Sequence, residues 1–260
     1  WSSTNSYTTV AGDAGYTIYA QVQRTSCQAG CNSASSGNLA SWAVVADPTS
    51  PVAATRNPDV DEVCAGQTLT LTVAGATGGN PGVGCSIQYR YSTNGGTSWS
   101  TESTTIPSFA AVAGAANIIQ ARRANCQAGC DSPTTFNTLV SWNVVPDPVA
   151  PTATKSPNVT TVCAGQTLTL TGVTDNGGGT GTCTIEYCYS TNGGSSYTSW
   201  SNTVPSFAAT GTDNRIKVRK YCDGAGCGTG AETTYTWSVV ADPSATTATK
   251  SPNVAAVCAG

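Results

Sequence analysis

An internal repeat of nearly 100 residues constrains this 260-residue chain more than any other feature. The string Val-Cys-Ala-Gly-Gln-Thr-Leu-Thr-Leu-Thr begins at Val63 and again at Val162, and its first four residues return at Val257. A fixed period of this kind is typical of one structural unit that is repeated along the chain. The sequence therefore predicts a tandem array rather than one large domain.

Three Asp-Pro steps, at Asp47, Asp147 and Asp242, mark the boundaries between repeats. Proline cannot donate a backbone hydrogen bond to a strand ladder, so these steps are expected to separate strands. The predicted units are the second half of a repeat at 1–46, complete repeats at 47–146 and 147–241, and the start of a further repeat at 242–260. A chain that begins and ends inside a repeat is expected to be part of a longer array.

Each repeat is predicted to be an all-β unit. Residues 68–72 alternate between leucine and threonine, and Ile87, Tyr89 and Tyr91 alternate with polar residues, as half-buried strands do. The following Asn-Gly-Gly at 94–96 favours a hairpin. About seven short strands in each repeat fit an immunoglobulin-like β-sandwich, with a small barrel as the alternative.

Twelve cysteines indicate an oxidising compartment and a disulfide framework. Buried free thiols, or zinc bound through a pair such as Cys27 and Cys31, are the alternatives, although the chain has no histidine. The candidates for disulfide bonding are Cys27, Cys31, Cys64, Cys85, Cys126, Cys130, Cys163, Cys183, Cys222, Cys227 and Cys258.

Strand counting favours one of two pairings inside a repeat. The start of the third strand and the end of the sixth lie at the same pole, which brings Cys85 near Cys126 and Cys130. Cys64 lies at the opposite pole, where it could reach the following repeat. The rival pattern is local and joins Cys126 to Cys130 and Cys64 to Cys85. The sequence alone leaves both patterns open.

Cys188 is an extra cysteine that stands where the first complete repeat has Arg90. Strand alternation places Cys188 on the polar face, opposite Tyr187 and Tyr189. We therefore expect an unpaired thiol or an intermolecular link rather than a core residue.

The charge and composition exclude several classes of function. The net charge is −3 and only 10% of residues are charged, which argues against nucleic-acid binding. No apolar stretch is long enough to insert into a membrane. Without histidine, and without paired carboxylates or a nucleophile–base pair at positions shared by the repeats, the sequence predicts neither an enzyme nor a cofactor.

Two surface features could bind a ligand, and each has a structural alternative. Asp59, Asp61 and Glu62 offer oxygen ligands for Ca²⁺, but the next repeat does not reproduce this acidic run. Trp99 and Trp200 could stack on sugars, although hairpin packing is the favoured role for both.

Two further features are interpreted as structural. The octapeptide at 92–99, repeated at 190–197, resembles the Asp-box hairpin of sialidases, which implies a turn and no activity. A basic strip is interpreted as the solvated face of a strand; it comprises Arg122, Arg123, Arg219 and Lys220.

The repeat resembles the immunoglobulin-like repeats of very large Bacteroidota surface proteins. The motifs that carry the resemblance are Cys-Ala-Gly-Gln-Thr-Leu-Thr-Leu-Thr, Tyr-Arg-Tyr-Ser-Thr-Asn-Gly-Gly and, at 222–227, Cys-Asp-Gly-Ala-Gly-Cys. These motifs are similar to those of type IX-secreted, gliding-type adhesins. The resemblance implies export to the cell surface and a long, thin protein.

The expected function is an extracellular structural or adhesive stalk or filament. Its expected partners are neighbouring repeats of the same chain, identical chains in a filament, and surface glycans. The alternative is a carbohydrate-binding accessory module of a secreted protein, which would present the same exposed aromatic platform in every repeat.

Overall fold

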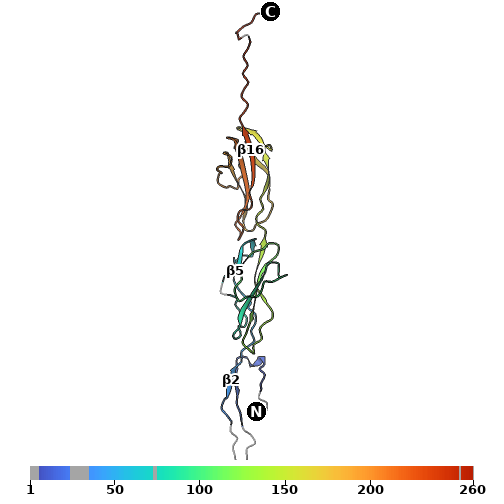
Figure 1. Cartoon of the computed structure of the whole chain (residues 1–260), viewed down its shortest axis with the longest axis vertical. Helices are drawn as coiled ribbons and strands as arrows, with labels where there is room; N and C mark the ends of the chain where they lie inside the picture. Colours follow the sequence, from blue (N-terminus) through green and yellow to red (C-terminus); the bar gives the residue numbers. More distant parts are fainter. Residues whose placement is uncertain (1–5, 24–34, 73–74, 252, 260) are drawn as a thin grey trace, which may run out of the picture. The chain divides into compact units, whose positions relative to one another are not determined.

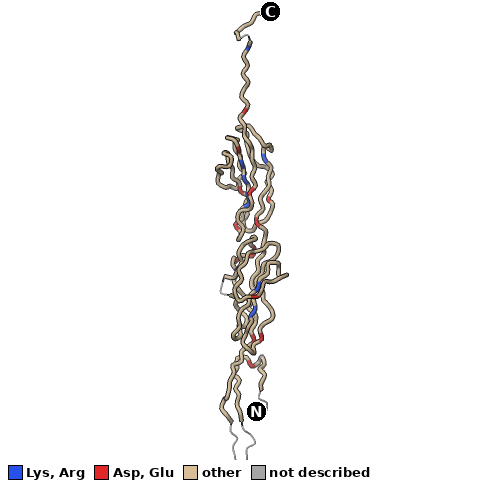
Figure 2. Tube along the Cα trace, viewed as in Figure 1, with Lys and Arg blue, Asp and Glu red and all other residues tan. Residues whose placement is uncertain are grey.

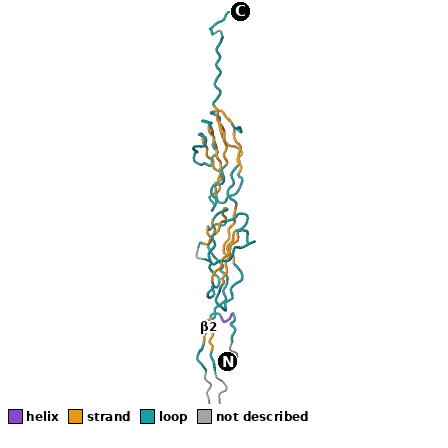
Figure 3. The backbone as a smooth tube through the Cα atoms, viewed as in Figure 1, coloured by secondary structure: helices purple, strands orange, loops and turns teal. Residues whose placement is uncertain are grey.

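The computed structural model describes residues 6–23, 35–72, 75–251 and 253–259. The chain divides into two compact units, Trp1–Pro146 and Asp147–Gly260. Strands dominate both units, and the 3₁₀ turn η1 (Ala11–Asp13) is the only helical segment among the described residues (Figure 3). The fold is therefore all-β, as the alternating patterns predict.

The repeat at 47–146 is a sandwich of two sheets. Its described residues form a three-stranded sheet in the order β3-β5-β7 and a four-stranded sheet in the order β4-β9-β8-β6. Its strands are β3 (Arg56–Asn57), β4 (Glu62–Cys64), β5 (Thr68–Leu71), β6 (Ser86–Ser92), β7 (Phe109–Ala110), β8 (Asn117–Ala124) and β9 (Asn137–Val145). β4 runs parallel to β9, whereas the other paired strands are antiparallel. Three strands packed on four form the immunoglobulin-like sandwich.

The repeat at 147–241 has the same architecture (Figure 1). Its sheets have the orders β10-β12-β14 and β11-β16-β15-β13, again with one parallel pair, β11 with β16. Its strands are β10 (Thr152–Ser156), β11 (Thr161–Cys163), β12 (Thr167–Thr174), β13 (Cys183–Ser190), β14 (Phe207–Ala208), β15 (Asp213–Cys222) and β16 (Thr233–Val240). The internal repeat of the sequence is thus a repeat of structure.

The described residues of the two incomplete repeats form few strands. Near the N-terminus, β1 (Thr17–Ala20) and β2 (Ala40–Ala43) form an antiparallel pair. The expected disulfide candidates Cys27 and Cys31 lie outside the described residues. The described residues of 242–260 contain no strand.

The core of each sandwich consists of the apolar residues that alternate along its strands. Their largest fully buried side chains include Leu69, Ile119 and Trp142 in one repeat and Leu168, Ile216 and Trp237 in the other. Each buried tryptophan also donates a hydrogen bond from its indole Nε1, to the carbonyl of Pro58 or Pro157, at 2.9 Å in both repeats. Burial of the ring and the hydrogen bond from its indole nitrogen therefore hold the tryptophan at the same position in both repeats.

A fully buried asparagine closes the loop before the long strand of each repeat. Asn117 accepts from the Val112 amide at 3.0 Å and donates to the carbonyls of Val112 and Ala115. Asn214 accepts from the Thr210 amide at 3.2 Å and donates to the Thr210 carbonyl. Because these loops have no strand partner of their own, the side-chain amide satisfies their backbone groups.

The chain enters and leaves each sandwich at opposite ends, which we call the N-terminal and C-terminal poles. In the second complete repeat, the N-terminal pole contains Val149, whose amide donates to the Gly177 carbonyl at 3.0 Å. Its C-terminal pole contains Ala164, whose amide donates to the Val240 carbonyl at 2.9 Å. The ten residues of β15 run from one pole to the other, a distance of roughly 30 Å.

The first complete repeat is built in the same way. At its N-terminal pole, the Thr49 amide donates to the Asn80 carbonyl at 2.8 Å. At its C-terminal pole, the Ala65 amide donates to the carbonyl of Val145, the last residue of β9, at 3.1 Å. The preceding and following segments therefore attach to opposite ends of each repeat.

Replacing Asn214 with alanine should destabilise the repeat at 147–241 by about 2 kcal/mol, because buried backbone groups of the loop lose their partner. Urea unfolding followed by tryptophan fluorescence measures this change. The exposed Asn202→Ala in the same repeat is the matched control and should have little effect. Equal stabilities of the two variants would contradict this role of Asn214.

Candidate functional site

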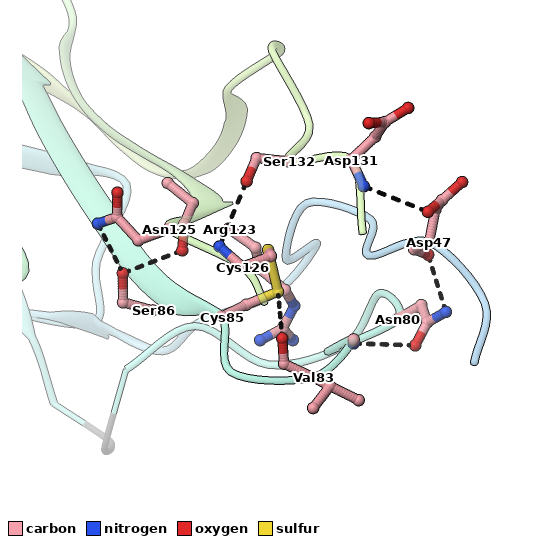
Figure 4. The surroundings of a disulfide bond; sticks show 12 residues. Asp47, Asn80, Val83, Cys85, Ser86, Arg123, Asn125, Cys126, Asp131 and Ser132 are labelled. Carbon is pink, nitrogen blue, oxygen red and sulfur yellow. Dashed lines mark hydrogen bonds between the residues drawn. A yellow bond between two sulfur atoms is a disulfide. The ribbon is translucent and has the colours of Figure 1, made fainter. Parts of the chain in front are cut away.

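A disulfide fastens the N-terminal pole of each complete repeat. Cys85, just before β6, is bonded to Cys126, just after β8 (Figure 4). Cys183 and Cys222 are bonded in the same way and lie directly opposite each other on β13 and β15. The structure thus adopts one of the pairings that strand counting favours, and the rival local pairing is wrong.

The linker into the first complete repeat is bound beside this disulfide (Figure 4). The Asp131 amide donates to Asp47 Oδ1 at 3.3 Å, and Asn80 Nδ2 donates to the Asp47 carbonyl at 2.9 Å. The Asp-Pro step is therefore held by the loops that the disulfide joins.

Two residues of the predicted basic strip point inward, which corrects its interpretation as a solvated face. Arg123 is 9% exposed and donates to the carbonyls of Thr49 and Gly78 at 3.2 and 3.0 Å. Lys220, at the equivalent position of the next repeat, is 6% exposed. Both continue the inward alternation of their strands, so the period-two pattern contained the signal.

Lys220 is neutralised by a carboxylate in place of carbonyl groups. Its Nζ lies 3.0 and 2.9 Å from the two carboxylate oxygens of Asp175. The hydrogen bond from Lys220, together with one from the Gly177 amide, lowers the pKa of Asp175 below its usual value. The inward cation is therefore satisfied in both repeats, by different partners.

The remaining described cysteines are in two states. Cys64 and Cys227 are also disulfide-bonded. Cys130, Cys163 and Cys258 are free thiols, of which Cys163 and Cys258 are exposed. Equivalent cysteines of the two complete repeats thus differ in state: Cys64 is bonded where Cys163 is free.

Cys188 is free, as one alternative predicted, but it is buried at 3% exposure. It lies opposite Lys217 on the outer face of its sheet, as strand alternation predicted, although the sequence did not predict its burial there. Desolvation raises the pKa of its thiol. In this fold the thiol is poorly placed for an intermolecular link.

The outer face of the first four-stranded sheet is covered by cation–aromatic stacks. The Arg90 guanidinium lies 4.3 Å from the centroid of the Trp99 ring and 4.0 Å from that of Phe136. Arg122 packs on the Phe136 ring at 4.8 Å and forms a 2.7 Å ion pair with Glu102. Trp99 is thus engaged by an arginine of its own repeat.

The second complete repeat covers the same face with a different set of residues. The Arg219 guanidinium stacks on the Trp200 ring at 4.0 Å and forms a 2.8 Å ion pair with Glu186. Lys217 lies 4.8 Å from the Tyr197 ring centroid and pairs with Glu232 at 2.8 Å. Because Trp200 is not the counterpart of Trp99, the two repeats present no common tryptophan platform.

The octapeptide hairpin is closed by a polar network that is the same in both repeats. Ser92 Oγ accepts from the amides of Asn94 and Gly96, and Asn94 Oδ1 accepts from the Ser98 amide at 2.9 Å. Ser190, Asn192, Gly194 and Ser196 reproduce these bonds. The network uses the polar side chains within the turn, in keeping with a folding element.

The three carboxylates of the calcium hypothesis are engaged by other groups. Arg56 forms ion pairs with Asp59 at 3.4 Å and Asp61 at 2.5 Å, while Asn143 Nδ2 donates to Glu62 Oε1 at 2.7 Å. Among the described residues, no group of three or more histidine, cysteine, aspartate or glutamate side chains is placed to hold a metal ion. The calcium hypothesis is therefore not supported.

A groove of about 460 Å³ in the first complete repeat is lined by residues 54–56, Asp59 and residues 138–141. Charged side chains are sparse along both repeats (Figure 2). Among the described residues, no helix has the length and hydropathy needed to cross a membrane.

Neither a protein-family model nor a curated protein matches this chain. The solved structures that are similar to it include three at 12–14% identity. The fibronectin(III)-like modules of Clostridium thermocellum CbhA share 14% identity over 75% of this chain and 93% of that chain, with a TM-score of 0.32. Domains A168–A170 of titin share 12% identity over 86% of this chain and 73% of that chain, with a TM-score of 0.34. The FN1–FN3 domains of chicken CNTN1 share 13% identity over 79% of this chain and 70% of that chain, with a TM-score of 0.27.

Timed alkylation of the native chain should modify Cys188 at least about tenfold more slowly than Cys163, because burial disfavours the reactive thiolate. Mass spectrometry of the alkylated peptides measures both rates. Denaturant should abolish the difference, which serves as the control. Equal rates in the native chain would contradict the burial of Cys188.

Asp175→Asn should lower the unfolding midpoint of the repeat at 147–241 at neutral pH, because Lys220 loses its counter-ion. Because the pKa of Asp175 is lower in the folded chain than its ordinary value of 3.8, the ion pair stabilises the fold at pH values above 3.8. This stabilisation is lost as the pH falls through the pKa of the folded state. The difference from the natural sequence should therefore shrink in acid. Thermal unfolding across this range measures it, with the exposed Asp242→Asn as control. A difference independent of pH would contradict the ion pair.

Proposed function

We propose that this chain is part of an extracellular structural stalk built from tandem immunoglobulin-like repeats. The opposite positions of the two poles are the observation that carries the proposal. A repeat that is entered at Val149 and left at Val240, at opposite ends, adds its own length to an array. Repetition of the same connection lengthens the protein in one direction, as in other arrays of stacked units.

The disulfides support an extracellular location. Cys85–Cys126 and Cys183–Cys222 each join two strands of one sheet at the end where the preceding segment attaches. Disulfides persist in oxidising environments and are rare in reducing ones. The resemblance to Bacteroidota surface repeats extends this proposal to export and display at a cell surface.

The outer faces favour a stalk over a carbohydrate-binding module. A sugar platform needs aromatic rings whose faces are free, yet Trp99 and Trp200 each carry a stacked arginine. The counterpart of Trp99 is Tyr197, which packs under Lys217. These rings instead pack on cationic side chains of their own sheet. Adhesive contacts of the stalk, or its association with identical chains, would use other parts of the array.

A glycan array incubated with the whole chain should give no saturable binding. Trp99→Ala should instead weaken the fold of its repeat, because the Arg90 stack is lost, which urea unfolding would detect. Saturable glycan binding that disappears in a still-folded Trp99→Ala variant would favour the carbohydrate-binding alternative. Phe136→Ala removes the other ring of the same stack and is the matched control.

A further inference from the structure

We propose that the peptide bond between Asp47 and Pro48 is a self-cleaving site, at which the Asp47 carboxyl group attacks its own backbone carbonyl. This inference goes beyond the stalk function and does not depend on it. An aspartate side chain can reach its own carbonyl carbon by closing a five-membered cyclic anhydride, so the nucleophile is already attached to its target. The bond to proline is a tertiary amide, whose nitrogen is more easily protonated as it leaves than that of an ordinary peptide bond.

The carbonyl that would be attacked is held by a side-chain donor. Asn80 Nδ2 donates to the carbonyl oxygen of Asp47 at 2.9 Å (Figure 4). The orientation of the Asn80 amide is fixed, because its Oδ1 accepts from the Gly82 amide at 3.2 Å. The Asn80 backbone is held by Thr49, whose Oγ1 accepts from the Asn80 amide at 2.5 Å. Negative charge develops on the Asp47 carbonyl oxygen during attack, so this donor is in place to stabilise the tetrahedral intermediate.

The Asp47 carboxylate is oriented by one contact and keeps one oxygen available. Its Oδ1 accepts from the Asp131 amide at 3.3 Å, whereas its Oδ2 accepts no hydrogen bond from the described residues. Asp47 is exposed, but Pro48 is buried against Gly82, where an added Cβ would lie 2.8 Å from the proline Cβ. The free oxygen can therefore attack, water can reach the product, and the leaving side of the bond is anchored in the repeat.

The proposed reaction is a hydrolysis in two steps. Asp47 Oδ2 bonds to the Asp47 carbonyl carbon, and the C–N bond to Pro48 breaks. The carboxyl proton passes to the proline nitrogen, which leaves as a secondary amine. Water then opens the cyclic anhydride and leaves two carboxyl groups on Asp47. The net change is the addition of one water molecule, with no oxidation or reduction, and it divides the chain at the entry to the repeat at 47–146.

The equivalent Asp-Pro bond of the second complete repeat lacks this donor. The counterpart of Asn80 is Gly178, since each lies five residues before the first cysteine of its pole disulfide. The Asp147 carbonyl oxygen occupies the space into which a side chain at Gly178 would project. The asparagine that binds this linker, Asn176, donates to the Ala150 carbonyl instead, at 2.6 Å. Selective cleavage at Asp47 is therefore expected.

Incubation of the folded chain in mildly acidic buffer tests the proposal, because acid supplies protons to the leaving nitrogen. Asp242 is the matched internal control, since it and Asp47 both stand between alanine and proline and both are exposed. Mass spectrometry after reduction and denaturation measures the fragments that end at Asp47, Asp147 and Asp242. We expect cleavage at Asp47 to be about tenfold faster than at the other two. In urea, where the fold is lost, the three rates should become similar.

Three variants of the whole chain make the result specific. Asn80→Ala should lower the rate at position 47 to that at Asp242, because the carbonyl loses its donor. Asp47→Glu should also lower it, because attack would then close a six-membered ring. Asn176→Ala removes the linker contact of the other repeat and should leave the rate at Asp47 unchanged. Tryptophan fluorescence shows whether each variant is folded, and the comparison of Asp47 with Asp242 in the unaltered chain decides if Asn80→Ala is not.

Hydroxylamine added to the reaction should trap the anhydride as a hydroxamate at Asp47, a product that direct hydrolysis does not form. Equal rates at Asp47 and Asp242 in the folded chain would overturn the proposal, as would an unchanged rate in a folded Asn80→Ala variant. Cleavage at Asp47 without hydroxamate would overturn the anhydride step. None of these results bears on the stalk function, which glycan binding tests separately.

Discussion

The parallel pairing of an early strand with the last strand of each sandwich determines what each repeat can do. The last strand, β9 or β16, ends at the C-terminal pole, where the chain leaves the repeat. Its parallel neighbour, β4 or β11, ends at the same pole and carries the Cys-Ala-Gly turn with it. The repeated cysteine is therefore presented at the point where the following repeat begins.

Strand alternation predicted the sheets because the same residues that alternate in sequence fill the core. It also placed Cys85 at the pole of Cys126, since sequence order fixes which strand ends meet. It did not predict the burial of Cys188, because the segment after β13 turns back and pairs with that strand, and its rings pack on Lys217 and Arg219, which a single-strand pattern does not include. The inward positions of Arg123 and Lys220 were not predicted, because charged side chains were assumed to face solvent. Inside the repeat, backbone carbonyls accept hydrogen bonds from Arg123, and Asp175 forms an ion pair with Lys220.

The two complete repeats keep their interior and their poles but differ on the outer face. The buried tryptophan, the loop-closing asparagine and the pole disulfide occur in both. The cation–aromatic stacks of the outer face differ between them. Arg90 packs between the rings of Trp99 and Phe136, whereas its counterpart Cys188 lies beside the Lys217–Glu232 ion pair. A binding platform shared by the repeats would need the same outer surface in each repeat. A stalk needs only that the chain enters and leaves every repeat at the same two poles.

Small-angle X-ray scattering of the whole chain tests most directly whether repeats with opposite poles form an extended array. A sandwich with strands of this length spans on the order of 35–45 Å, so two placed end to end should give a maximum dimension of at least about 80 Å. A maximum dimension close to that of two sandwiches packed side by side would contradict the account.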